Sequence, residues 1–76
     1  MLVVSAETVY PGDYTNDTGS VIRLHEVWVE NRVMSIRYSW IQGRKDLLGP
    51  EREHTLRLGS EWGWDRHVHI IEETPV

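Results

Sequence analysis

The strongest constraint on the fold is a pair of neighbouring runs rich in β-branched and aromatic residues. They extend from Val21 to Glu30 and from Val33 to Ile41, and the short stretch Glu30-Asn31-Arg32 separates them. Such a composition favours strands, and so short a connection between two strands favours a hairpin. A long antiparallel hairpin is therefore predicted at the centre of the chain.

The register of this hairpin decides which side chains face the core. A three-residue loop would pair Val29 with Val33, and we favour it because it gives the cleaner apolar face. That face contains Ile22, Leu24, Trp28, Met34, Ile36, Tyr38 and Trp40, with Glu26 as its one charged member. A two-residue Asn31-Arg32 loop would instead gather Val27, Val29, Met34, Ile36 and Tyr38 and set Glu26 opposite Arg37. Arg32 is poorly suited to the positive φ that tight loops often need.

The rest of the chain is divided by turn-forming residues. A first strand is predicted from Leu2 to Tyr10, followed by Pro11-Gly12 and a polar loop through Ser20. A polar connection from Gln42 to Glu53 follows the hairpin, and Pro50 could open a short helical turn there. Alternation then predicts a strand at residues 54–58, a Trp-bearing turn at 59–65 and a final strand at 66–72.

This pattern predicts one all-β domain over residues 1–76. Five short strands without an amphipathic helix are typical of a small antiparallel barrel or a strongly twisted sheet, and SH3-like and OB-like barrels both have that strand count. A chain of 76 residues buries only about 60% of its unfolded surface. With no Cys, it has neither a disulfide nor a thiolate zinc site, which leaves efficient packing or a homo-oligomer as the expected supplement to the core.

Charge argues against a general polyanion binder. The formal net charge is −4, whereas nonspecific binding to nucleic acid comes mainly from clustered Lys and Arg. In the favoured register, however, Arg23, Arg37 and His25 share one hairpin face, which Arg57 could extend. A single-stranded nucleic-acid binder using this face and stacked Trp rings is the alternative function.

Catalytic and metal-binding patterns are weak. There is no Cys, no Gly-x-Ser-x-Gly sequence and no phosphate-binding glycine loop, so no enzyme activity and no cofactor are expected. His67 and His69 would project from one strand face, where His25, His54 or Glu73 could complete a metal site. Because Val68 and Ile70 would face the core, we interpret these histidines as solvated and expect no metal. The acidic loop at residues 13–19 departs from the EF-hand spacing and is interpreted as a turn.

The Trp62-Gly63-Trp64 turn is the predicted partner-binding site. Flanked by Glu61 and Asp65, its two indoles cannot easily both enter a core on one side, so at least one should be exposed and serve as an anchor. The alternative is that one ring plugs the open end of a barrel. The predicted function is a non-enzymatic protein-binding, inhibitory or assembly module, self-associating, whose partner is another protein docked on this turn or on an edge strand.

Location follows from the absence of targeting patterns. No apolar run approaches the roughly 18 residues of a membrane-spanning helix, and the N-terminus lacks a basic stretch before a long apolar segment. No membrane association is expected, and the predicted location is the cytoplasm.

Overall fold

The computed structural model describes residues 1–67, which form seven strands and no helix. The strands are β1 (Leu2–Val3), β2 (Gly12–Thr15), β3 (Val21–Glu30), β4 (Val33–Gln42), β5 (Arg52–Arg57), β6 (Glu61–Trp62) and β7 (Asp65–Arg66). Nothing in this part of the chain is a helix long and apolar enough to cross a membrane. The all-β prediction is confirmed.

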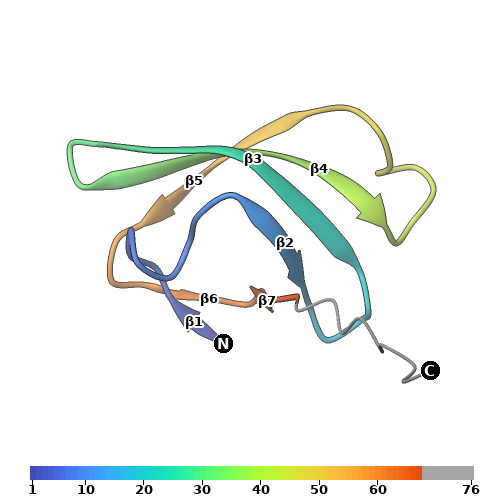
Figure 1. Cartoon of the computed structure of the whole chain (residues 1–76), viewed down its shortest axis with the longest axis horizontal. Coiled ribbons are helices and arrows are strands. Elements are labelled where there is room, and N and C mark those ends of the chain that lie inside the picture. Colours follow the sequence, from blue (N-terminus) through green and yellow to red (C-terminus); the bar gives the residue numbers. More distant parts are fainter. Residues whose placement is uncertain (68–76) are drawn as a thin grey trace, which may run out of the picture.

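The strands form two antiparallel sheets. β1 pairs with β6, and the main sheet has the order β5-β4-β3-β2-β7. In Figure 1 the long β3–β4 hairpin and β5 lie above β1, β2, β6 and β7. Over residues 1–67 the main sheet stays open, with β5 at one edge and β7 at the other, and it does not close into a barrel.

The central hairpin has the predicted strands, but it follows the favoured register only before His25, where Ile22 pairs with Trp40 and Leu24 with Tyr38. Glu30 pairs with Val33, so the loop contains only Asn31 and Arg32. Their φ angles are 50° and 64°, the left-handed values that a two-residue type I′ turn requires. The three-residue loop is therefore wrong, and Glu26 lies opposite Arg37 as in the alternative.

A β-bulge at His25 explains why the sequence is compatible with both registers. Leu24 pairs with Tyr38 and Glu26 with Arg37, which leaves His25 as an extra residue without a partner in the ladder. One extra residue moves all later side chains to the other face of the strand. Ile22 and Leu24 before the bulge therefore share a face with Val27 after it. Trp28, predicted for the core, instead lies on the outer face, half-buried with the Arg37 guanidinium 5.8 Å from its ring centroid.

The N-terminal segment also differs from its prediction. The predicted strand from Leu2 to Tyr10 ends at Val3, because the chain turns where the Ser5 and Thr8 side chains bond the backbone: the Ser5 amide donates to Thr8 Oγ1 (3.0 Å) and the Thr8 amide to Ser5 Oγ (3.2 Å). Local bonds of this kind compete with strand pairing. A strand, β2, then occupies part of the predicted polar loop.

No helix forms at Pro50, and the fourth predicted strand begins earlier, at Arg52. β7 covers Asp65–Arg66, at the start of the final strand predicted over 66–72. Residues 68–72 of that prediction lie outside the described residues.

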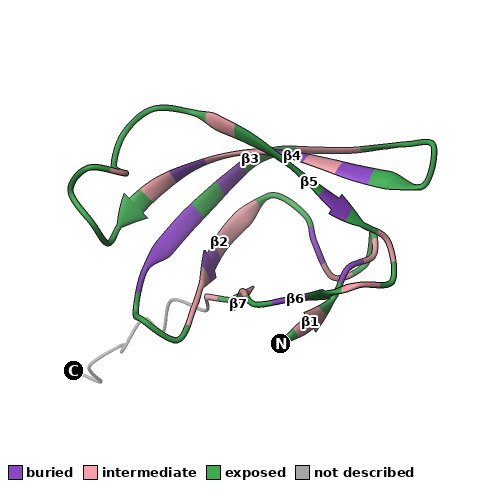
Figure 2. Cartoon of the chain, turned by 180° about the vertical axis from the view of Figure 1, so that it is seen from behind, coloured by how far each residue is buried: buried purple, intermediate pink, exposed green. Residues whose placement is uncertain are grey.

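The core lies between the hairpin and the N-terminal strands, where Figure 2 shows the buried segments. Its buried members are Val4, Val9, Tyr14, Ile22, Leu24, Met34, Ile36, Leu56 and Trp62. Tyr14 is central: the side chain has no exposed surface, and its hydroxyl donates to Tyr10 O (2.8 Å) and accepts from Tyr10 N (2.9 Å). Burial raises the pKa of this phenol to about 12.

The strained turn generates the first prediction. Replacing Arg32, at φ 64°, with Gly removes the steric cost that an L side chain meets in the left-handed region. We expect Arg32→Gly to raise the free energy of unfolding by about 0.5–1 kcal/mol, because type I′ turns prefer Asn-Gly. Arg32→Ala, which removes the side chain but keeps the strain, should not do so. Urea unfolding of the three proteins checks this, and equal gains for both variants would contradict it.

The buried phenol generates the second prediction. Because its pKa is raised from 10 to about 12 by folding, Tyr14 stabilises the fold below pH 10 and loses that contribution as the pH rises toward 12. The difference corresponds to at most about 3 kcal/mol. The free energy of unfolding of Tyr14→Phe should be lower than that of the unmodified chain at pH 8. Because the variant has no phenol at this position, it should not show the fall between pH 10 and 12. Parallel denaturant unfolding across this range checks it, and parallel pH curves for the two proteins would contradict it.

Candidate functional site

The open edge of the main sheet at β5 is the candidate site. β5 has six residues and pairs along one side with β4, and no other described strand pairs with it. The opposite edge, β7, has only two residues. An unpaired strand presents a row of free backbone N–H and C=O groups that can pair with another chain. Of these two end strands, β5 therefore offers the larger surface for pairing.

The register determines which β5 groups point outward. In an antiparallel ladder, bonded and non-bonded pairs alternate, and the pair that closes a two-residue turn is bonded. Counting from Glu30–Val33 at the turn, the even residues of β4 direct their backbone groups toward β5. The Trp40 carbonyl agrees, because it accepts a hydrogen bond from Gly49 N on the β5 side. It follows that Glu53, Thr55 and Arg57 point their backbone groups away from the sheet.

A row of alternating charges crosses the outer face to this edge. On three neighbouring strands, Glu26, Arg37 and Glu53 lie side by side. Arg37 Nη1 donates to Glu26 Oε2 and Arg37 Nη2 to Glu53 Oε1, both at 3.1 Å. The hydrogen bond to Glu53 and the charge of Glu26 raise the pKa of the Arg37 guanidinium. The row ends at the edge with a carboxylate, so a strand added there would be favoured by a cation opposite Glu53.

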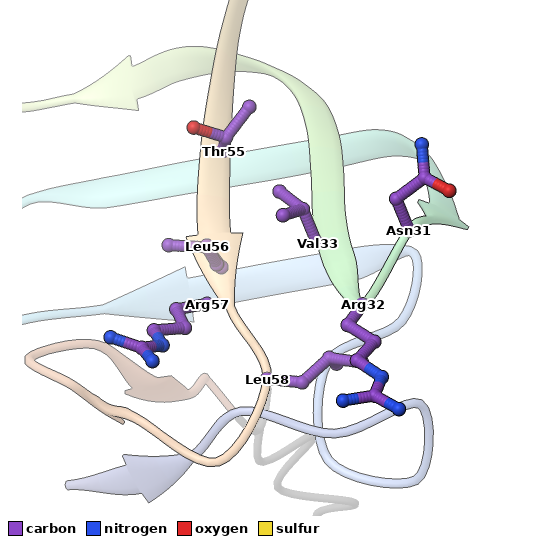
Figure 3. A pocket seen from close by; sticks show the side chains of 7 residues that line it. All are labelled: Asn31, Arg32, Val33, Thr55, Leu56, Arg57 and Leu58. Carbon is purple, nitrogen blue, oxygen red and sulfur yellow. The ribbon is translucent and has the colours of Figure 1, made fainter.

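A cavity of about 690 Å³ adjoins the end of the same strand. It is lined by Asn31, Arg32, Val33, Thr55, Leu56, Arg57 and Leu58. Figure 3 shows that these side chains come from the hairpin turn and from the end of β5, with Arg32 and Arg57 on either side of Leu58 in this view. The lining carries two guanidinium groups and no carboxylate. The cavity is therefore suited to an acidic or polar group.

The four residues of the predicted nucleic-acid face lie on the outer side of the sheet. Two of them, Arg23 and Arg37, form ion pairs with carboxylates. Arg23 donates to both carboxylate oxygens of Asp13, at 2.8 and 3.2 Å, which raises the pKa of its guanidinium. Arg37 is held by two glutamates. His25 sits in the bulge with its Nε2 2.7 Å from Ser39 Oγ, and Arg57 is exposed at the cavity.

The Trp62-Gly63-Trp64 turn is more buried than predicted. Trp62 is 8% exposed, with its ring centroid 5.3 Å from that of Tyr14. Trp64 is half-buried, with an edge-on contact to Trp40 at 5.3 Å. The expectation of an exposed indole is wrong, because the turn crosses the concave side of the sheet and both rings pack against it. Of the flanking acids, Glu61 is exposed and Asp65 lies at the amino group of Met1.

The histidines give no metal site that can be described. Within residues 1–67, no three His, Asp or Glu side chains are grouped to hold a metal ion. His69 and Glu73, two of the residues considered as ligands, lie outside the described residues. The acidic loop contains an Asn16 turn instead, in which Asn16 Oδ1 accepts from the amides of Thr18 and Ser20, both at 3.1 Å.

Comparison of the chain with protein-family models, with curated proteins and with solved structures gives no match. The candidate site therefore depends on its own geometry. Sequence reasoning named edge strands in general but missed Glu53 and Thr55, because only the register shows that they face the open edge.

The burial of the Trp turn generates the third prediction. Trp62→Ala should lower the free energy of unfolding by about 3–5 kcal/mol, because it removes a large ring from the core. Glu61→Ala, one residue away and exposed, should change it by less than about 0.5 kcal/mol. Denaturant unfolding measures both. If Trp62→Ala kept its stability but lost self-association, the turn would be a contact surface after all.

Proposed function

We propose that this chain is a small, non-enzymatic protein-binding and assembly module that accepts an added strand at the open edge of β5. The observation that carries the proposal is the unpaired six-residue edge with its outward-facing Glu53, Thr55 and Arg57. Strand addition uses the main chain for affinity and the alternate side chains for specificity. The partner is another protein segment in extended conformation.

The composition of β5 discourages indiscriminate pairing but permits pairing with a strand of complementary charge. Proteins commonly protect edge strands by making them very short, by bulges, by Pro, or by charged side chains, especially Lys. β5 has no Pro or Lys, and its paired register with β4 is regular along all six residues. The strand carries charges of both signs instead, and these would repel a strand with the wrong pattern while attracting one with the complementary pattern.

Electrostatics favour this function over binding of single-stranded nucleic acid. Phosphate neutralisation needs free cations, and the Arg23 and Arg37 guanidinium groups are each bonded to carboxylates. Trp28, the indole nearest Arg37, is half-buried. A polyanion on this face would have to displace Asp13, Glu26 and Glu53.

The finer architecture that we propose is an open, SH3-like arrangement. β2 to β5 are consecutive in the chain and adjacent in the sheet, and β7 returns beside β2. This meander supports an SH3-like over an OB-like arrangement, because the OB-fold is a Greek-key barrel. In this arrangement both ends of the strand order are open edges within residues 1–67, and strand addition needs one such edge.

The fourth prediction tests strand addition directly. A fluorescein-labelled nine-residue peptide with the core Glu-Val-Thr-Val-Arg, paired antiparallel to β5, sets its Arg against Glu53 and its Glu against Arg57. A second peptide with Glu and Arg exchanged opposes like charges at both places. We expect the first peptide to bind at least about tenfold more tightly in fluorescence anisotropy at low protein concentration.

A control on the backbone separates pairing from simple charge attraction. The first peptide, N-methylated at its central Thr, keeps every charge but loses a bonding amide, so it should bind more weakly than the unmethylated peptide. Equal binding of the charge-exchanged peptide, or equal binding of the N-methylated one, would show that the β5 edge does not accept strands in this way.

A further inference from the structure

We infer that the strand added at β5 is the β5 strand of a second copy of this chain, paired antiparallel about a two-fold axis through Thr55. This inference rests on the proposed function, because it names the partner of the same edge. The complementary strand for β5 must read Glu-x-Thr-x-Arg, with Arg opposite Glu53, a small polar residue opposite Thr55 and Glu opposite Arg57. β5 itself has that sequence, from Glu53 to Arg57.

Hydrogen-bond alternation limits the registers available. Only Glu53, Thr55 and Arg57 direct backbone groups outward, so an added strand must bond at those positions. With the axis at Thr55, each of these residues faces another outward-directed residue: Thr55 faces its own copy, and Glu53 faces the partner's Arg57. Five bonded and non-bonded pairs then alternate without a break, from 53 to 57.

Charge selects this axis among those the alternation allows. An axis at Glu53 or at Arg57 would oppose two like charges, which destabilises an antiparallel pair. An axis at His54 or Leu56 sets Thr55 against one of the charged residues, and the axis at His54 offers Arg57 only the partner's Glu51, which lies outside β5. Only the axis at Thr55 opposes Glu53 to the partner's Arg57, and symmetry provides that pair twice.

The charge row and the cavity both continue across this interface. In each chain, the row from Glu26 through Arg37 to Glu53 gains the partner's Arg57 as its next cation. The partner's Glu51, two residues before its Glu53, is then level with the residues just after β5 in the first chain. That places a carboxylate near the cavity that Arg32 and Arg57 line.

The fifth prediction is a symmetric crosslink. The chain has no Cys, so Thr55→Cys introduces one thiol, and residues facing each other in a bonded antiparallel pair have Cα atoms about 5.5 Å apart, within disulfide range. Mild oxidation of Thr55→Cys should give a covalent dimer that persists on non-reducing gels. Ser35→Cys is the matched control: it lies beside Thr55 on β4, one strand away from the axis, and should stay mostly monomeric.

Charge reversal tests the register without a crosslink. Glu53→Arg and Arg57→Glu should each weaken dimerisation at least about tenfold in sedimentation equilibrium, because each creates two like-charge pairs. An equimolar mixture of the two variants should dimerise again, since every facing pair then has opposite charges. Circular dichroism and melting temperature verify that both variants fold.

The outcomes separate this inference from the proposed function. If Ser35→Cys crosslinks as well as Thr55→Cys, or if the mixed variants stay monomeric, the Thr55 register is wrong. If the unmodified chain is monomeric but binds the charge-matched peptide, strand addition stands and the second copy is not the partner. If the chain is monomeric and that peptide does not bind, both proposals fail.

Discussion

The extra residue at His25 allows a tight turn and a continuous apolar face to exist in the same hairpin. Counting back from the two-residue turn, an unbroken β3 would place Val27 inside and therefore also Arg23 and His25. The bulge reverses that alternation, so that Ile22 and Leu24 are buried and Arg23 turns outward to Asp13. The pairing of Glu26 with Arg37, and with it the charge row that reaches β5, follows instead from the two-residue turn, because Glu26 lies on the turn side of the bulge.

Aromatic contacts on the inner side of the main sheet form one chain, from Tyr14 through Trp62 and Trp64 to Trp40. Tyr14 and Trp62 join the N-terminal strands to the short β1–β6 sheet, while Trp64 packs edge-on against Trp40 of the hairpin. These contacts close the concave side of the main sheet with side chains instead of with backbone pairing. Because no described strand hydrogen-bonds to the outer side of β5, the sheet keeps a six-residue edge there.

The sequence predicted the elements with strong local signals and missed those set by tertiary pairing. The strands over 21–30 and 33–42 were predicted almost to the residue, because β-branched and aromatic residues dominate them. The bulge could not be predicted from the sequence, because inward and outward side chains alternate correctly in each half of β3, but in different registers. β2 was missed because only Tyr14 of its four residues is buried. The candidate edge depends on strand order, which no local pattern contains.

Arg32 is the residue whose local cost has the clearest relation to the candidate site. A glycine would satisfy the left-handed φ of 64° without strain, and Asn31 already supplies the other residue that type I′ turns prefer. Strained positions persist mainly where the surrounding structure or a function requires the side chain. Arg32 lines the cavity at the end of β5 together with Arg57, and no carboxylate lines it. A carboxylate bound beside such a guanidinium group would stabilise it. A second β5 strand would bring the partner's Glu51 and Glu53 to that end.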